Sequence, residues 1–350
     1  MVRRVAFAVP GHLDAPTGGY GYDRRIIAEL RQLGYAIEVL DLGDRFPRPT
    51  GETKAAALAA LAGLPPGLPV IIDGLAYGVL PELAGDLCKA RPVIALVHHP
   101  LALETGLSDD GAEALRTSER TALAGASRVI VTSEATASLL ASEYGVPREK
   151  ITVARPGVDH VAPAPRKEGG PVALLSVGSL MPRKGYDVLI AALAEVADLD
   201  WRLVVAGPRN RDRATAERIA AQIKALGLNA RVTLAGAVPP DRLAALFATA
   251  DLFVLASRFE GYGMAFAEAI SYGLPVIGTS AGAIPEAVPQ GVGLLVPPDD
   301  VAALAATLRR LIGDRGERER LAAAARAAAS RLPTWETAAR LVASAIESVA

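Results

Sequence analysis

The sequence contains very little of what marks several large classes of protein. Only one of its 350 residues, Cys88, is a cysteine, which excludes an internal disulfide and a thiolate metal cluster. We expect this thiol to be a small buried apolar group. A net charge of −1 gives no field that would gather nucleic acid. No stretch approaches the roughly 20 apolar residues that cross a bilayer, and the first apolar run is too short for a signal peptide. We therefore expect a cytoplasmic protein with no transmembrane segment and no nucleic-acid partner.

What the chain does contain is an alternation of short apolar runs with amphipathic stretches, which is typical of parallel sheets covered by helices. A hydrophobic fraction of 51% over this length is enough for two domains of ordinary size. The expected strands of the first half span residues 4–9, 36–40, 69–72, 93–97, 128–132 and 151–153. Those of the second half span residues 172–177, 202–206, 232–234, 252–255, 276–278 and 294–296.

The two halves are separated by residues 161–171, VAPAPRKEGGP, whose proline, glycine and charge indicate a linker. We expect a first domain over residues 1–168, a second over residues 169–333 and a final helix over residues 334–350. The fold class is α/β, with two doubly wound, Rossmann-like domains. Because such sheets bind ligands at the carboxyl ends of their strands, the residues that follow each strand are the candidates for a site.

The motif EGYGMAFAE, residues 260–268, follows one expected strand and opens a helix. Its glycines let backbone amides approach a ligand, and the start of a helix favours an anion such as phosphate. Glu268 lies about one turn inside the helix, where its carboxylate can accept hydrogen bonds from a ribose diol. Glu260 precedes the helix and can bond other hydroxyls. The alternative is that both acids are solvated and simply favoured by the helix dipole.

A second motif, SVGSLMPRKGYD, also joins a strand to a helix. Arg183 and Lys184 stand at the helix start, where cations oppose the helix dipole unless an anion is present. A diphosphate would remove that conflict. The alternative is that both cations are solvated in a loop.

Two motifs of the first half also come after expected strands. In PTGGYGYD, residues 16–23, Gly18 and Gly19 can bring amides to a ligand, although Arg24 stands where a dinucleotide fingerprint requires its third glycine. The expected strand 93–97 ends in His98-His99-Pro100, which places a histidine ring at the sheet edge. A structural and a catalytic role for that ring stay equally open.

These motifs, together with ARPGVD and RPVIALVHHP, resemble the retaining GT-B glycosyltransferases of family 4 over nearly the whole chain and in the same order. The resemblance implies two Rossmann-like domains that face a central cleft, with the C-terminal helix returning to the first domain. It also implies that Glu268 holds the nucleotide ribose and Glu260 the donor sugar. Arg183 and Lys184 would neutralise the diphosphate, and His98 would lie beside the sugar. The amides of the remaining donor-binding residues would approach sugar and phosphate: Gly18, Gly19, Gly261, Tyr262, Gly263 and Met264.

The reaction implied is transfer of a sugar from a nucleotide diphosphate to an acceptor hydroxyl, with retention and without a protein nucleophile. No cofactor and no metal are expected, because the only Asp-x-Asp, residues 198–200, precedes a strand and so lies at the wrong edge of its sheet. Two alternatives remain: a nucleotide-cofactor oxidoreductase, for which Asp41 is suitably placed, and a non-catalytic sugar-nucleotide binding protein. The sequence also departs from the family, with Glu260-Gly-Tyr-Gly263 in place of EPFG and with the loop 207–212 near the base.

The acceptor is the least specified part of the reaction. In this family, first-domain loops choose it, and the polar candidates are Tyr20, Tyr22, Glu104, Thr105 and Ser108. The first domain carries 18 basic and 20 acidic residues. Such a composition does not attract anionic lipid strongly, so a small soluble or sugar-containing acceptor is favoured over a lipid.

Overall fold

A computed structural model of the chain describes residues 3–15, 17–159 and 169–349. It divides into two compact units. The first unit comprises Met1–Gly157 and Pro333–Ala350, and the second comprises Val158–Leu332. Along the chain, the boundaries between the units therefore fall at residues 157/158 and 332/333. The sequence had placed the first boundary at 168/169. That expected boundary and most of the expected linker fall on residues 160–168, outside the described residues.

The first unit contains a six-stranded parallel sheet with the order β2-β1-β3-β4-β5-β6. Its middle strands are buried along their whole length, as expected for a sheet covered on both faces. The order reverses between β1 and β3, which makes the carboxyl ends of these strands a switch point. The strands are β1 Arg3–Val9, β2 Tyr35–Asp41, β3 Val70–Asp73, β4 Val93–Val97, β5 Arg128–Val131 and β6 Ile151–Val153.

The helices of the first unit begin at residues whose side chains accept hydrogen bonds from the first turn. Thr17 caps α1 and Ser108 caps α5. The helices are α1 Gly18–Gln32, α2 Gly51–Ala62, α3 Gly74–Tyr77, α4 Asp86–Ala90, α5 Asp109–Gly125 and α6 Glu134–Glu143, with short 3-10 turns η1 Pro81–Ala84, η2 Leu101–Leu103 and η3 Arg148–Lys150. Cys88, expected to be buried, is only half-buried on α4 at the edge of the core.

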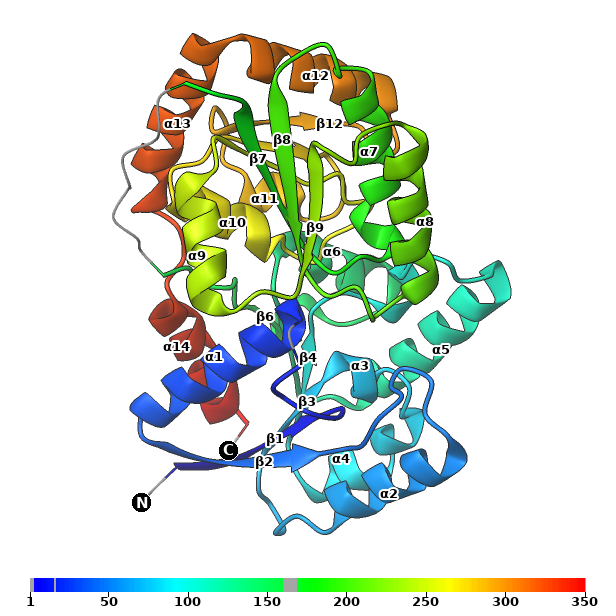
Figure 1. Ribbon diagram of the computed structural model, residues 1–350. Coiled ribbons are helices and arrows are strands. Elements are labelled where there is room, and N and C mark those ends of the chain that lie inside the picture. Colours follow the sequence, from blue (N-terminus) through cyan, green and yellow to red (C-terminus); the bar gives the residue numbers. More distant parts are fainter. Residues whose placement is uncertain (1–2, 16, 160–168, 350) are drawn as a thin grey trace. The chain divides into compact units, whose positions relative to one another are not determined.

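The last helix, α14 Trp335–Glu347, belongs to the first unit. It packs against α1, β5 and β6, and Figure 1 shows it beside α1. Thr334 caps it by accepting a bond from the Thr337 amide at 3.1 Å. The first residue of this helix, Trp335, packs closely against Gly157, where the first stretch of the unit ends. A Cβ on Gly157 would stand 2.1 Å from the Trp335 nitrogen. The expected return of the C-terminal helix to the first domain is confirmed.

The second unit contains another six-stranded parallel sheet, with the order β12-β11-β10-β7-β8-β9. Its order reverses between β7 and β10, so the carboxyl ends of these two strands form its switch point. The strands are β7 Val172–Val177, β8 Trp201–Ala206, β9 Val232–Gly236, β10 Leu252–Val254, β11 Val276–Thr279 and β12 Gly293–Val296. All twelve strands that the sequence predicted are present, which confirms the α/β fold class.

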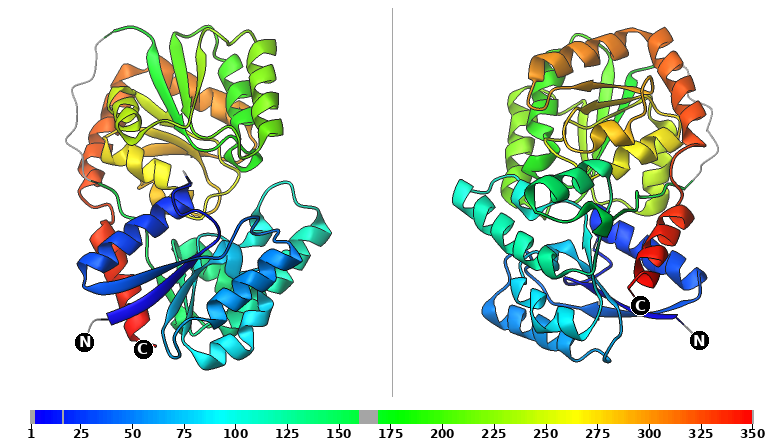
Figure 2. Two further views of the ribbon diagram at one scale, coloured as in Figure 1. Left: turned by 60° about the horizontal axis from the view of Figure 1, so that its bottom comes forward. Right: turned by 180° about the vertical axis from the view of Figure 1, so that it is seen from behind.

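Helices cover this second sheet and bury its apolar strands in one continuous core (Figures 1 and 2). They are α7 Tyr186–Ala194, α8 Arg213–Ala225, α9 Pro240–Thr249, α10 Met264–Ser271, α11 Ile284–Ala287, α12 Val301–Gly313 and α13 Arg315–Ala329, with the 3-10 turn η4 Pro182–Lys184. Among the described residues, no helix of either unit has both the length and the apolar character needed to span a membrane.

Candidate active site

In the second unit, the loops after β7 and β10 are fixed against each other at the switch point. Gly185 has a φ of +62°, and a Cβ there would lie 1.9 Å from the Ala256 carbonyl oxygen. The Arg258 amide donates to the Arg183 carbonyl at 2.8 Å. Glycine is therefore required at position 185 both by the close approach and by the left-handed backbone. The two loops carry the charged residues that the sequence singled out.

Glu260 is the centre of a buried charged group formed by these loops. Its Oε1 accepts hydrogen bonds from the Lys184 ammonium and the Ser257 hydroxyl, each at 2.6 Å. Its Oε2 lies 3.2 Å from the Arg183 guanidinium, which also donates to the Phe259 carbonyl at 2.8 Å. The structure thus brings together three residues that the sequence treated as two separate motifs.

The electrostatics keep this carboxylate charged. Burial alone would raise the pKa of Glu260, but the charges of Lys184 and Arg183 and hydrogen bonds from Lys184 and Ser257 outweigh burial and lower that pKa to about 2. Two cations thus face one carboxylate in a largely buried place. Such a place, beside a helix start, suits an anion that can be shared between the two cations.

Glu268 lies on α10, one turn inside the helix that follows Glu260. Burial raises the pKa of Glu268 to about 7, and the charge of Asp159 adds to this effect. The helix starts after Gly263, whose φ of +100° needs a glycine. Tyr262 is only 5% exposed and its ring belongs to the core of the second unit. Any contact of Tyr262 with a ligand is therefore left to its backbone, as the sequence proposed.

In the first unit, His98 follows β4 and is held by residues from two other elements. Its Nε2 lies 3.2 Å from an oxygen of Asp23, on α1, and 3.5 Å from an oxygen of Asp73, at the end of β3. A Cβ on Gly19 would stand 3.2 Å from the ring carbon Cδ2. Gly18 and Gly19 are the first two residues of α1, where amides have no partner within the helix. The absence of a side chain at position 19 thus admits the histidine ring, a role that the sequence did not reveal.

One of the five expected acceptor contacts, that of Tyr22, is contradicted by the structure, and Ser108 has a structural role that leaves acceptor binding open. Tyr22 is completely buried and its hydroxyl donates to the Ala154 carbonyl at 2.9 Å, so it is a packing residue. The Ser108 hydroxyl accepts from the Gly111 amide at 3.2 Å and serves as the cap of α5.

The other three acceptor candidates also have local partners. The Tyr20 hydroxyl donates to the Pro10 carbonyl, and Glu104 accepts from the Thr105 amide at 3.1 Å. An oxygen of Glu104 also lies 3.5 Å from His99. These contacts neither establish nor exclude binding of an acceptor.

Several residues with a place in these groups were missed. Asp73 ends a wholly buried strand, which is a signal that the sequence does contain. Asp23 faces the core from α1, and Ser257 lies three residues before Glu260. Asp23, Asp73 and His98 form the group that could hold a metal ion among the described residues, with candidate atoms within 4.8 Å of one another.

Two other features bear on the sequence predictions. Asp198 is an exposed partner of Arg309 just before β8, which places it at the amino edge of the sheet as expected. Asp41, which an oxidoreductase would use for a ribose, accepts a bond from the Gly43 amide at 2.7 Å.

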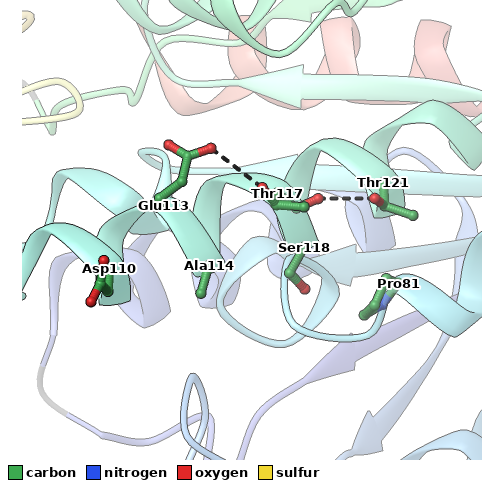
Figure 3. Close-up of a pocket in the computed structure, with 7 residues that line it drawn as sticks. All are labelled: Pro81, Asp110, Glu113, Ala114, Thr117, Ser118 and Thr121. Carbon is green, nitrogen blue, oxygen red and sulfur yellow. Dashed lines mark hydrogen bonds between the residues drawn. The ribbon is translucent and has the colours of Figure 1, made fainter.

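A pocket elsewhere on the first unit contains none of these residues. It lies along α5 and η1. Two of the hydroxyls that line it donate hydrogen bonds within α5: Thr117 to the Glu113 carboxylate and Thr121 to the Thr117 carbonyl (Figure 3). Its lining consists of Pro81, Asp110, Glu113, Ala114, Thr117, Ser118 and Thr121.

Comparison with protein families gives two matches that together cover most of the chain. The family described as Glycosyl transferases group 1 matches residues 160–328, and the family described as Glycosyltransferase Family 4 matches residues 77–161.

Similar proteins of known name are D-inositol 3-phosphate glycosyltransferases. The one from Acidothermus cellulolyticus is 32% identical over 315 residues, which cover 82% of this chain and 69% of that protein. The one from Thermobispora bispora is 34% identical over 282 residues, covering 73% and 66%. The match to the Nocardia farcinica protein, 32% identical over 220 residues, covers 58% of this chain and 49% of that protein. The chain thus spans between about half and two thirds of the length of these relatives.

Solved structures share the fold of both units. Sucrose-phosphate synthase from Thermosynechococcus elongatus is 21% identical with a TM-score of 0.84, covering 99% of this chain and 98% of that one. The Anabaena protein HepE in complex with UDP-glucose is 20% identical with a TM-score of 0.77, covering 99% of each chain. The chain belongs to the group 1 glycosyltransferases of family 4, and its two Rossmann-like domains are those of the GT-B fold.

Proposed function

We propose that this protein transfers a sugar from a nucleotide diphosphate sugar to an acceptor hydroxyl, with retention at the anomeric carbon and without a metal ion. The observation that carries the proposal is the buried group of Glu260, Lys184 and Arg183 at the switch point of the second unit. Departure of the nucleoside diphosphate builds negative charge on its oxygens, and two fixed cations can stabilise that charge. Glu268 would hold the ribose, and Glu260 would bond a sugar hydroxyl while it keeps both cations in place.

The experiment that tests this proposal incubates the protein with a panel of sugar nucleotides and candidate acceptors. Release of free nucleoside diphosphate, dependent on an acceptor, is expected with one donor. The configuration of the new linkage, read by NMR, then decides retention: a product of inverted configuration would contradict it. Hydride transfer to a nicotinamide, or binding without turnover, would instead support one of the alternative functions.

Chelation gives a separate prediction. Because Lys184 and Arg183 supply the positive charge that a metal would otherwise give, we expect excess EDTA to leave turnover within about twofold. The measurement compares initial rates before and after chelation. Complete loss that Mn²⁺ or Mg²⁺ restores would contradict the metal-free mechanism.

For the acceptor, we propose a small soluble or sugar-containing hydroxyl compound. The names of the relatives support a phosphorylated polyol among the compounds to be tested, and D-inositol 3-phosphate is one of them. Mass spectrometry of reaction mixtures with polyols, their phosphates and sugars reads the product directly. Transfer only to a lipid in vesicles would contradict the proposal.

Glu268 should make donor binding depend on pH. With a pKa raised to about 7, this side chain is mostly neutral at pH 6 and mostly ionised at pH 8. Only the carboxylate offers both oxygens as acceptors to a ribose diol. We therefore expect the affinity for the product nucleoside diphosphate, measured by calorimetry, to increase from pH 6 to pH 8. Glu268→Gln is the control, since it keeps the shape and removes the titration. Equal slopes in both proteins would assign the pH effect to the ligand's phosphate alone.

A further inference from the structure

The ring of His98 is enclosed by its surroundings in the first unit. Nε2 points at two carboxylates, 3.2 Å from Asp23 and 3.5 Å from Asp73. Both acids are buried, with exposed fractions of 0% and 2%. Asp73 is itself fixed, because its other oxygen accepts the Leu75 amide at 2.7 Å as the cap of α3.

Two further neighbours are in contact with the ring. Gly19 lies against its Cδ2 and Nε2 edge, and the ring of Tyr22 meets it edge-on at 5.4 Å between centroids. Rotation of the ring would require these neighbours to move. Within the part of the chain that the structure describes, Nδ1 has no hydrogen-bond partner, and one fifth of the side chain is exposed. The ring nitrogen left for a ligand is therefore Nδ1.

The charges around the ring favour its protonated form. The titratable groups packed against it are Asp23 and Tyr22 from α1 and Asp73 from the end of β3. Burial alone would lower the pKa of His98, but the two carboxylates outweigh burial and raise that pKa. Burial, together with the charge of Asp73, raises the pKa of Asp23. A neutral ring would leave two neighbouring buried acids without a cation, which is the costlier arrangement.

We propose that Asp23 and Asp73 are positioning residues that hold His98 as a cation, with Nε2–H directed at the two carboxylates and Nδ1–H left to donate to an oxygen of a bound substrate. This inference rests on the proposed function for its ligand, but the charge and orientation of the ring can be tested without turnover. It assigns a role to two acids that the donor-site motifs do not include. It also explains the oxygen Oδ2 of Asp23, buried without a hydrogen-bond partner in the described structure: its charge is balanced by the imidazolium.

The direct test follows the imidazole nitrogens by NMR between pH 5.5 and 10. The sequence has four histidines, and His98→Gln identifies the signal of interest. We expect His98 to stay doubly protonated at least about one pH unit above the ordinary value of about 6.5. Asp23→Asn and Asp73→Asn should each lower its titration point. Glu104→Gln, which removes the acid beside His99, is the matched control and should leave the His98 signal unchanged.

Activity adds a readout that a merely structural role would not alter. In Asp23→Asn, the ratio of variant to wild-type kcat/KM for the donor should fall as pH rises from 6 to 9, because the variant loses the proton of His98 in this range. The inference is overturned if wild-type His98 titrates near 6.5, or if neither Asp variant changes its titration. A stoichiometric metal ion, present in the purified protein and lost in both variants, would also overturn it by placing Nε2 on the metal.

The two proposals fail separately. If no nucleotide sugar is turned over but His98 titrates as expected, the proposed function fails and the charge assignment stands. If sugar transfer occurs while His98 is neutral at pH 7, the proposed function stands and this inference fails.

Discussion

Replacing Lys184 or Arg183 with alanine is expected to lower the turnover of sugar transfer at least about tenfold, with a smaller effect on donor affinity. Each cation stabilises charge that grows as the diphosphate leaves, so the loss should appear chiefly in kcat. Lys184→Ala has the larger expected effect, because Lys184 makes the shorter contact with Glu260, 2.6 Å against 3.2 Å. Steady-state kinetics, with the donor that the panel of sugar nucleotides identifies, measures both constants.

Removal of a cation also leaves the buried Glu260 with fewer partners, so stability must be separated from chemistry. The double variant Lys184→Ala with Glu260→Gln removes both charges and should recover the thermal stability that Lys184→Ala loses, without recovering turnover. Arg309→Ala is the matched control, since it removes an exposed cation of the same unit that pairs with Asp198. Wild-type kinetics in both Lys184→Ala and Arg183→Ala would contradict a role of these two cations in stabilising the diphosphate.

Deletion of residues 334–350 is expected to lower the melting temperature by about 10 °C or more, because it removes a helix whose apolar face lies in the core of the first unit. The same deletion breaks polar contacts of Glu347 with Tyr35, at 3.0 Å, and of Ser348 with Arg128, at 2.9 Å. Donor turnover should fall as well. Calorimetry and activity assays of the truncated protein provide the measurements. An unchanged melting temperature together with unchanged turnover would show that the helix contributes to neither.

A point variant can disturb the packing of α14 against the first unit while the helix itself stays in the chain. Gly157→Ala places a Cβ 2.1 Å from the Trp335 nitrogen, so the helix start must shift. Its destabilisation should approach that of the deletion. Gly51→Ala is the matched control, because a Cβ at that position meets nothing within 4 Å. Equal melting temperatures for these two variants would contradict the close packing at position 157.

The strands and the order of motifs could be predicted from the sequence because both are local patterns. A run such as VALLSV is apolar at every position except Ser176, and the glycines that follow such runs mark the sheet edge where chains turn. Identification of Arg183, Lys184 and Glu260 as candidates followed from the same reasoning. The contacts among these three residues could not be predicted in this way. Lys184 and Glu260 are 76 residues apart in the sequence, and only the strand order brings them together.

Two of the acceptor candidates have structural roles that their polarity did not reveal. Ser108 and Tyr22 are polar and adjacent to loops, but each satisfies a need of the backbone: one caps a helix and the other bonds a carbonyl inside the core. The sequence Ser108-Asp-Asp does carry a capping signal, and the structure shows Ser108 as the cap of α5. Asp23 lies among the buried residues of α1, where a charge is rarely found without a partner, and that partner is His98, which follows β4 and lies 75 residues away in the sequence.

The first unit is built from two stretches of chain, and the second lies between them as one continuous stretch. This arrangement sets an order of events during synthesis. The second unit can complete its core from consecutive residues as soon as Leu332 has left the ribosome, whereas the first must wait for α14 with the face of α1 uncovered. Nascent chains arrested before residue 333 should therefore hold a folded second unit and an incomplete first one, which is completed only when Trp335 packs beside Gly157.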